Sequence, residues 1–278
     1  CYFLAKETGR PVKMVLDYSE DFIATNPRHA AIMEVKAGVK LDGTITAWQA
    51  QFDFSCGAYA STKYAPSLSI AEIAGPYKTP NVRIDSNMVF TNTVPGGYFR
   101  APGETQGIFA GESHMDVVAR RLGMDPVELR LKNLIRDNDT LPSGHRYEAV
   151  RAEEVLLAAV QQSGFRNAKP PNGGRGIAIG HRPQGGGPTN VSVTVELDGT
   201  VIVGTSIFES GAGTYTLLKQ MVSDELGISP DRVRVAASAK DIVSPNDMGP
   251  VGARVSRVAG EGALQACEQA KQRFLDLA

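Results

Sequence analysis

The chain has 278 residues, of which 42% are hydrophobic, with a formal net charge of −1 and a pI near 6.5. This length supports one large domain or two domains of ordinary size. The charge is almost balanced and no basic block occurs, so nucleic acid is not an expected partner. No apolar run approaches the ~20 residues that a membrane-spanning helix needs, and nothing resembles a signal peptide.

The first residues predict a helix followed by a strand. Residues 2–7 read as the last turns of a helix that Gly9 closes, so the chain begins within an element and is expected to be a fragment. Residues 12–16 form an apolar run and predict a buried strand.

The cysteines and histidines do not have the spacing of metal ligands. Cys1, Cys56 and Cys267 are far apart, so neither a zinc site nor an iron–sulfur cluster is encoded, and reduced cytoplasmic thiols are the simplest account. His114 falls within a predicted helix, where a packed or solvated histidine is the simpler interpretation.

Two segments carry the same hairpin signature. Residues 34–54 contain an Asp-Gly turn at 42–43, and residues 191–208 contain one at 198–199. Asp-Gly between such runs is the strongest short-range hairpin signal, although these turns are also common in unrelated proteins. The repetition predicts two lobes built on a similar unit.

The remaining elements follow from periodicity and from glycine and proline signals. Asp125 is predicted to cap a helix that starts at Pro126, with Glu128 as the acidic partner of a capping box. The other predictions are a short helix or loop at 71–77, a strand at 81–90, a helix from Glu104 ended by Gly123, an exposed connection at 136–147, an amphipathic helix at 153–164, a linker at 166–174, strands at 175–180 and 231–235, and helices from residue 214 and over 258–277.

Three irregular loops stand next to predicted helices or strands. Residues 95–103 contain two Pro-Gly pairs and Arg100, whose guanidinium suits phosphate or carboxylate. Residues 209–214 join a strand to a helix without forming a Walker A motif. Such loops can present N–H groups to an anion, but an ordinary turn is the alternative at each. The glycine run at 185–187 either lies against a cofactor or is a flexible loop.

Residues 96–133, GGYFRAPGETQGIFAGESHMDVVARRLGMDPVELRLKN, resemble the molybdopterin-binding subunit of the xanthine dehydrogenase/aldehyde oxidase family of molybdenum hydroxylases. RPVKMVLDYSEDF at residues 10–22 is similar to a second segment of that family, and the resemblance extends over residues 9–278. The LGMDPVELRLKN part is close to diagnostic, although it is structural rather than catalytic.

This resemblance implies an α+β fold with two lobes of mixed or antiparallel sheets and helices packed on them. The lobes are expected at residues 1–165 and 174–278, with a molybdenum–molybdopterin cofactor in the cleft between them and the dinucleotide form left open. The implied reaction hydroxylates an aldehyde or an N-heterocycle with oxygen from water. Iron–sulfur and FAD groups would lie on other domains or subunits of an oligomeric cytoplasmic complex.

The resemblance also implies a set of site residues. Tyr98 and Phe99 are expected to line the substrate channel. Ala212 stands where the family has glutamine and Ala253 where it has serine, so both positions lack a side-chain donor. The cofactor-binding residues that the resemblance implies are Phe99, Arg100, Gly211, Ala212, Gly213, Thr214, Gly252, Ala253, Arg254 and Ser256.

No catalytic residue or metal ligand is assigned within the chain. The family's glycine-rich Phe-Gly-Gly-Lys loop is expected upstream of Cys1, and its catalytic glutamate beyond Ala278, so this polypeptide alone is expected to be inactive. Two alternatives stay open. One is a degenerate family member without cofactor that acts in assembly or partner binding, which Ala212 and Ala253 favour. The other is an unrelated phosphate or nucleotide binder.

Overall fold

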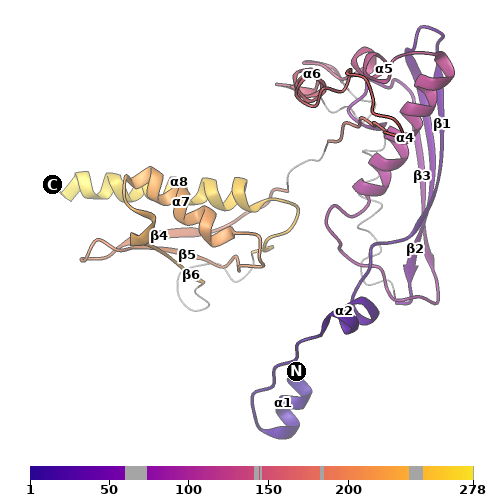
Figure 1. Cartoon of the computed structure of the whole chain (residues 1–278). Coiled ribbons are helices and arrows are strands. Elements are labelled where there is room, and N and C mark those ends of the chain that lie inside the picture. The colour runs from indigo at the N-terminus through magenta and orange to yellow at the C-terminus, as the bar shows by residue number, and fades with distance from the viewer. Residues whose placement is uncertain (60–73, 141–143, 145, 182–184, 238–246, 278) are drawn as a thin grey trace. The chain divides into compact units, whose positions relative to one another are not determined.

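The computed structural model describes residues 1–59, 74–140, 144, 146–181, 185–237 and 247–277 (Figure 1). It forms two compact units, Cys1–Arg182 and Pro183–Ala278. The elements of the first unit are α1 (Tyr2–Thr8), α2 (Tyr18–Ala24), β1 (Ala31–Val39), β2 (Ile45–Gly57), β3 (Val82–Phe90), α4 (Glu104–Leu122), α5 (Pro126–Asn133) and α6 (Ala152–Gln162). Those of the second are β4 (Val191–Val195), β5 (Val201–Thr205), α7 (Thr214–Leu226), the short 3₁₀ helix η2 (Pro230–Arg232), β6 (Val233–Ala237) and α8 (Val255–Leu277).

The two sheets have the same topology. In the first unit β1 and β2 form an antiparallel hairpin, and β3 pairs with β2 in parallel, so β2 is central. In the second unit β4 and β5 form the hairpin, and β6 pairs with β5 in parallel. Both Asp-Gly hairpins and the α+β class are therefore confirmed.

The core of the first unit lies between the sheet and α4. Alternate residues of β2 point into this core, because side chains alternate along a strand, and Trp48, Phe52 and Phe54 are almost fully buried. α4 runs along one face of the sheet and buries Met115 against it (Figure 1). As predicted, α4 ends at Gly123, which has the left-handed φ of 67°.

In the second unit, α7 and α8 cover the same face of the sheet (Figure 1). Leu218 and Val222 of α7 and Ala259 and Ala263 of α8 meet Val203 of β5 in the core. The small residues on α8 bring the two helices close. The structure moves two predicted boundaries, since α8 begins at Val255 rather than at 258, and the strand predicted at 231–235 is η2 followed by β6.

The N-terminal region differs from the prediction. α1 forms and is closed by Gly9, as expected. The buried strand predicted at residues 12–16 is wrong, because Val15 is 74% exposed and the segment pairs with no described strand. The unpredicted helix α2 follows, with Asp17 and Glu20 forming a reciprocal capping box.

The segment after α6 belongs to the first unit. The strand predicted at 175–180 is wrong, because these residues have no regular secondary structure and enter no sheet of the described chain. Ile177 and Ile179 pack on the first core, and the Arg175 guanidinium donates hydrogen bonds to the carbonyls of Phe165 and Ala168 at 2.7 and 3.0 Å. The contact boundary at 182/183 is thus downstream of the predicted linker, and the lobe ranges 1–165 and 174–278 stay a prediction.

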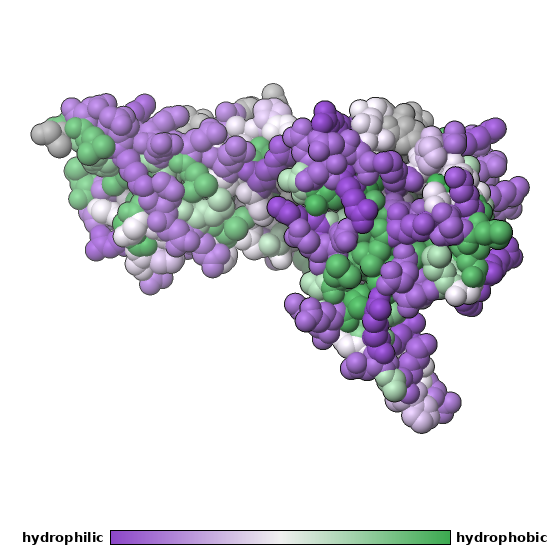
Figure 2. Space-filling model, turned by 90° about the horizontal axis from the view of Figure 1, so that it is seen from above, coloured by the Kyte–Doolittle hydropathy of each residue, from purple (hydrophilic) through white to green (hydrophobic). Residues whose placement is uncertain are grey.

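The surface mixes polar and apolar patches (Figure 2). Large exposed apolar side chains are frequent in residues 2–23 and at the end of α8, where Phe274, Leu275 and Leu277 are 55%, 70% and 85% exposed. Within the described chain, no helix is both long and apolar enough to span a bilayer.

Candidate functional site

Arg28 holds the loop at residues 98–103, which we call the arginine loop. Its guanidinium donates to the carbonyl oxygens of Arg100 at 2.6 Å and Ala101 at 3.1 Å, and lies 5.1 Å from the centre of the Phe99 ring. The side chain of Arg100 is exposed and has no hydrogen-bond or ion-pair partner among the described residues. One arginine therefore fixes the loop, while the other is left available to an external anion.

The glycine pair before this loop packs against the protein itself. A Cβ at Gly96 would lie 2.6 Å from the His29 ring, and one at Gly97 would lie 2.3 Å from Asn26. Asn26 also donates to the Pro95 carbonyl at 2.9 Å. The lack of a side chain at these two glycines thus lets the loop pack closely on residues 26–29.

A buried ionic network supports the helix that follows the loop. Glu112 accepts hydrogen bonds from Arg130 Nε at 2.8 Å, from the Tyr77 hydroxyl at 2.6 Å and from the Ile179 N–H at 2.9 Å. Asp116 lies 2.9 Å from Arg130 as an ion pair without hydrogen-bond geometry. Burial and the neighbouring Glu112 raise the pKa of Tyr77 far above its usual range, so the phenol stays protonated and donates.

The LGMDPVELRLKN segment, residues 122–133, makes structural contacts at both ends of α5. Asp125 accepts from the N–H groups of Val127 and Glu128, which confirms it as the cap of α5. Glu128 does not complete a capping box, because its carboxylate pairs with Arg166 at 2.7 Å. Asn133 accepts from the Ile45 N–H and donates to the carbonyls of Gly43 and Leu129, so the last residue of α5 holds the turn of the first hairpin.

In the second unit, the predicted loop at residues 211–214 binds a carboxylate of the protein itself, that of Glu209. The Glu209 carboxylate accepts from the N–H groups of Gly211 at 2.7 Å, Gly213 at 3.1 Å and Tyr215 at 3.2 Å. The predicted backbone donors of Gly211 and Gly213 are therefore taken in this structure. Ala212 is exposed, and the hydroxyl of Thr214 is buried without a partner among the described residues.

Arg254 is fully buried, and its guanidinium is bonded to groups of the protein itself. Its guanidinium pairs with Asp247 at 2.7 Å and donates to the carbonyls of Gly186 at 2.8 Å and Pro188 at 2.6 Å. Burial raises the pKa of Asp247, but hydrogen bonds from Thr189, Gly249 and Arg254 outweigh it and hold that pKa below its ordinary value. Arg254 thus joins the glycine-rich segment at 185–188 to the loop that precedes α8.

The neighbouring site residues are arranged around this joint. The Gly185 N–H donates to the Gly252 carbonyl at 2.7 Å. Ala253 has a φ of 57°, and Ala101 in the arginine loop has a φ of 55°. This left-handed backbone conformation is strained for alanine. Ser256 is exposed in the first turn of α8. Residues 241–246, which precede this joint in the chain, lie outside the described residues.

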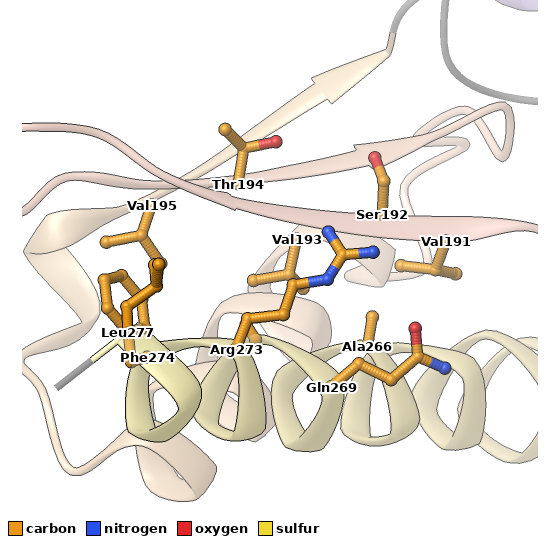
Figure 3. Close-up of a pocket in the computed structure, with 11 residues that line it drawn as sticks. Val191, Ser192, Val193, Thr194, Val195, Ala266, Gln269, Arg273, Phe274 and Leu277 are labelled. Carbon is orange, nitrogen blue, oxygen red and sulfur yellow. The ribbon is translucent and has the colours of Figure 1, made fainter.

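A groove of about 400 Å³ lies elsewhere in the second unit, between β4 and the C-terminal half of α8 (Figure 3). Arg273 and Phe274 project from α8 towards the strand, and Val191, Val193 and Val195 face them from β4 (Figure 3). None of the residues predicted to contact a cofactor lines this groove, so it is not the predicted site.

Each unit, taken by itself, contains groups that suit an anion. In the first unit, Arg100 is a cation with no partner among the described residues. In the second unit, the buried Thr214 hydroxyl likewise lacks a partner in the described chain. The N–H groups of the loop before α7 already bind the Glu209 carboxylate, so what this loop leaves for a ligand is the Thr214 hydroxyl. The fold and these loops define the class as a two-unit α+β protein with loops suited to anionic groups.

Comparison with known proteins names the family. Models described as "Molybdopterin cofactor-binding domain" match residues 1–134 and 158–278. The chain is 32% identical to an aldehyde oxidoreductase of Megalodesulfovibrio gigas over 95% of its length and 31% of that protein. It is 30% identical to a xanthine dehydrogenase molybdenum-binding subunit of Escherichia coli O157:H7, over 99% of this chain and 38% of that protein. This chain belongs to the molybdopterin-binding subunits of the xanthine dehydrogenase/aldehyde oxidase family.

A solved structure supports the same assignment. Quinoline 2-oxidoreductase from Pseudomonas putida 86 matches with a TM-score of 0.86 and 26% identity, covering 98% of this chain and 38% of that one. The chain thus spans about a third of the length of these relatives.

Two residues that matter to the site were not singled out from the sequence. Arg28 acts on groups more than 70 residues away, and no local pattern distinguishes it from the other arginines. Glu209 is local, and its signal was an acid two residues before a glycine loop. That position could have been read as an internal partner for the loop's N–H groups.

Proposed function

We propose that this chain is the cofactor-binding portion of a molybdenum hydroxylase that oxidises an aldehyde or an N-heterocycle with oxygen from water. The observation that carries the proposal is the Arg100 guanidinium, which has no partner among the described residues and lies on a loop fixed by Arg28, in a chain of molybdopterin cofactor-binding domains. The names of the relatives, an aldehyde oxidoreductase and a xanthine dehydrogenase subunit, support the substrate class.

The chain's own residues bind and orient the cofactor, and the cofactor supplies the redox chemistry. Arg100 offsets its negative charge, and Thr214 offers a hydroxyl. Tyr98 and Phe99, which are 73% and 56% exposed, are available to a substrate. Gly211, Ala212 and Gly213 contact it from one loop; Gly252, Ala253 and Ser256 do so from the other. Because its guanidinium is already bonded within the protein, Arg254 acts on the cofactor only through the two segments it joins, residues 185–188 and the loop before α8.

The larger assembly is part of the same proposal. Iron–sulfur and FAD groups on other domains or subunits would supply the electron transfer, and the pterin is bound either as such or as a dinucleotide. The exposed apolar side chains of residues 2–23 and of α8 support contact with further protein. None of the three cysteines is in a disulfide, which supports a cytoplasmic location.

Metal analysis and isotope labelling test this function. The protein at its natural full length, expressed in a host that makes the cofactor, is expected to contain stoichiometric molybdenum. With an aromatic aldehyde in ¹⁸O-water, the acid product should carry the label. Full-length protein without molybdenum would instead favour the degenerate family member that acts in assembly. The 278-residue chain alone is expected to show no turnover.

A variant pair tests the role of Arg100. Arg100→Met should lower the molybdenum and pterin content of the full-length protein, because it removes the cation that faces the cofactor. Arg121→Met is the matched control, since Arg121 is also exposed and lies at the far end of α4. Equal cofactor content in the two variants would remove Arg100 from the site.

A further inference from the structure

The loop before α7 is organised around the side chain of Glu209. Its two carboxylate oxygens together accept three backbone hydrogen bonds, from Gly211, Gly213 and Tyr215, at 2.7 to 3.2 Å. Gly213 is the N-cap residue of α7 and has no side chain, so Glu209, four residues upstream, satisfies the helix start in its place.

The geometry favours a charged carboxylate at this position. N–H groups at a helix start carry partial positive charge, and an anion there gains from the helix dipole as well as from the hydrogen bonds. The N–H groups of Tyr215, first, and of Gly213 and Gly211 hold the pKa of Glu209 below its usual value. Gly211 and Gly213 have φ angles of 89° and 80°, which turn the N–H groups of the loop in a way that residues with side chains rarely adopt.

We propose that Glu209 is a positioning residue: its carboxylate is an internal anion that sets the conformation of the Gly211–Thr214 loop before any ligand arrives. It follows that external anionic oxygens do not take the N–H groups of Gly211, Gly213 and Tyr215. A second part of the proposal rests on the proposed function. The loop contacts the cofactor through the groups that are not bonded to Glu209, which include the Thr214 hydroxyl and the exposed Ala212.

This assignment accounts for two features of the loop together. A bent backbone with two positive φ angles is costly to hold in water, and three hydrogen bonds to one carboxylate hold it without a ligand. Ala212 contributes no hydrogen-bonding side chain, so loop order has to come from another residue. Glu209 supplies that order and keeps the loop preformed, which lowers the entropy cost of binding.

Amide hydrogen exchange by NMR on the 278-residue chain tests the first part of the proposal. In Glu209→Ala, the amides of Gly211, Gly213 and Tyr215 should exchange about tenfold faster or more, because their acceptor is gone. Inorganic phosphate should slow this exchange again by replacing the lost anion. In the wild-type chain the same amides should not respond to phosphate. Glu268→Ala is the matched control, because Glu268 is exposed on α8 and accepts no hydrogen bond within the described chain.

Two results would overturn the proposal. Unchanged exchange in Glu209→Ala would mean that the carboxylate does not hold the loop. Wild-type amides that shift on addition of phosphate would mean that the loop is an open anion site from which Glu209 is displaced. Glu209→Gln, which keeps the size and one acceptor oxygen, replaces the alanine variant if that variant does not fold, and its Gly211, Gly213 and Tyr215 amides should exchange faster than those of the wild type.

Cofactor content of the full-length protein tests the second part. Glu209→Ala should retain several-fold less molybdenum and pterin than Glu268→Ala, which should match the wild type. If the wild-type protein contains no molybdenum, the proposed function fails while the exchange data still decide the role of Glu209. If the wild type is loaded and Glu209→Ala is loaded equally, the positioning role towards the cofactor is refuted.

Discussion

Replacing Arg254 by methionine should weaken the second unit more than any loss of surface charge. The side chains of Arg254 and Asp247 are 1% and 3% exposed, so the substitution leaves a carboxylate buried without its cation. It also removes the donors to the carbonyls of Gly186 and Pro188. The 185–188 segment should therefore separate from the loop before α8.

The magnitude follows from what remains around Asp247. Breaking a buried ion pair by removing one partner costs about 3–5 kcal/mol. Asp247 keeps hydrogen bonds from the Thr189 hydroxyl and the Gly249 N–H, both at 2.7 Å, so the lower figure of about 3 kcal/mol applies. For a domain of about 60–100 residues, 1 kcal/mol lowers the Tm by about 4–8 °C, which gives a decrease of roughly 12–24 °C.

Calorimetry of the chain measures this change, and hydrogen exchange of residues 185–195 assigns the transition to the second unit. Arg257→Met is the matched control, because Arg257 lies three residues on, is exposed and has no partner in the described structure. Its Tm should stay close to that of the wild type. If the two variants had the same Tm, the ionic joint would not carry the stability assigned to it.

Three further substitutions test the first unit. Asn133→Ala leaves the buried hairpin-turn groups without partners and should lower the free energy of unfolding by about 2–4 kcal/mol in urea titrations; a loss below about 0.5 kcal/mol would contradict this. Arg130→Met strands the Glu112 carboxylate and should cost about 3–5 kcal/mol in the same assay, whereas a neutral result would show that the network is dispensable. Burial lowers the pKa of His29 from its ordinary 6.5, so the folded state prefers the neutral ring, and stability present above pH 6.5 is lost as the pH falls towards the lowered pKa. His29→Phe should flatten the Tm profile over this range, with the residual slope owed partly to His114, whose pKa burial also lowers; parallel profiles would refute the role of His29.

The sequence was a good guide to elements with local signals and a poor one to contacts made at a distance. Both hairpins and α4 were predictable, since their turns and ends are encoded by Asp-Gly pairs and by Gly123. Residues 12–16 and 175–180 are apolar runs, and such a run does not reveal whether a partner strand exists. The second run packs its isoleucines on a core without entering a sheet.

The site divides in the same way. The loops themselves could be predicted from glycine, proline and resemblance. The use of their polar groups could not, because Arg28 acts across more than 70 residues and Arg254 reaches carbonyls 66 to 68 residues away. Arg254 was predicted to contact the cofactor, whereas its guanidinium is occupied within the protein.

β4 is an edge strand of its sheet, and this has a practical consequence for work with the isolated chain. Its Val-Ser-Val-Thr-Val sequence has no charge and no proline, and one side of its backbone is left unpaired by the described strands. Uncharged edge strands of this kind can pair with strands of other molecules and so promote aggregation. Concentrated solutions of the isolated chain should therefore self-associate through β4, and a lysine in place of the exposed Thr194 would act as a gatekeeper against it.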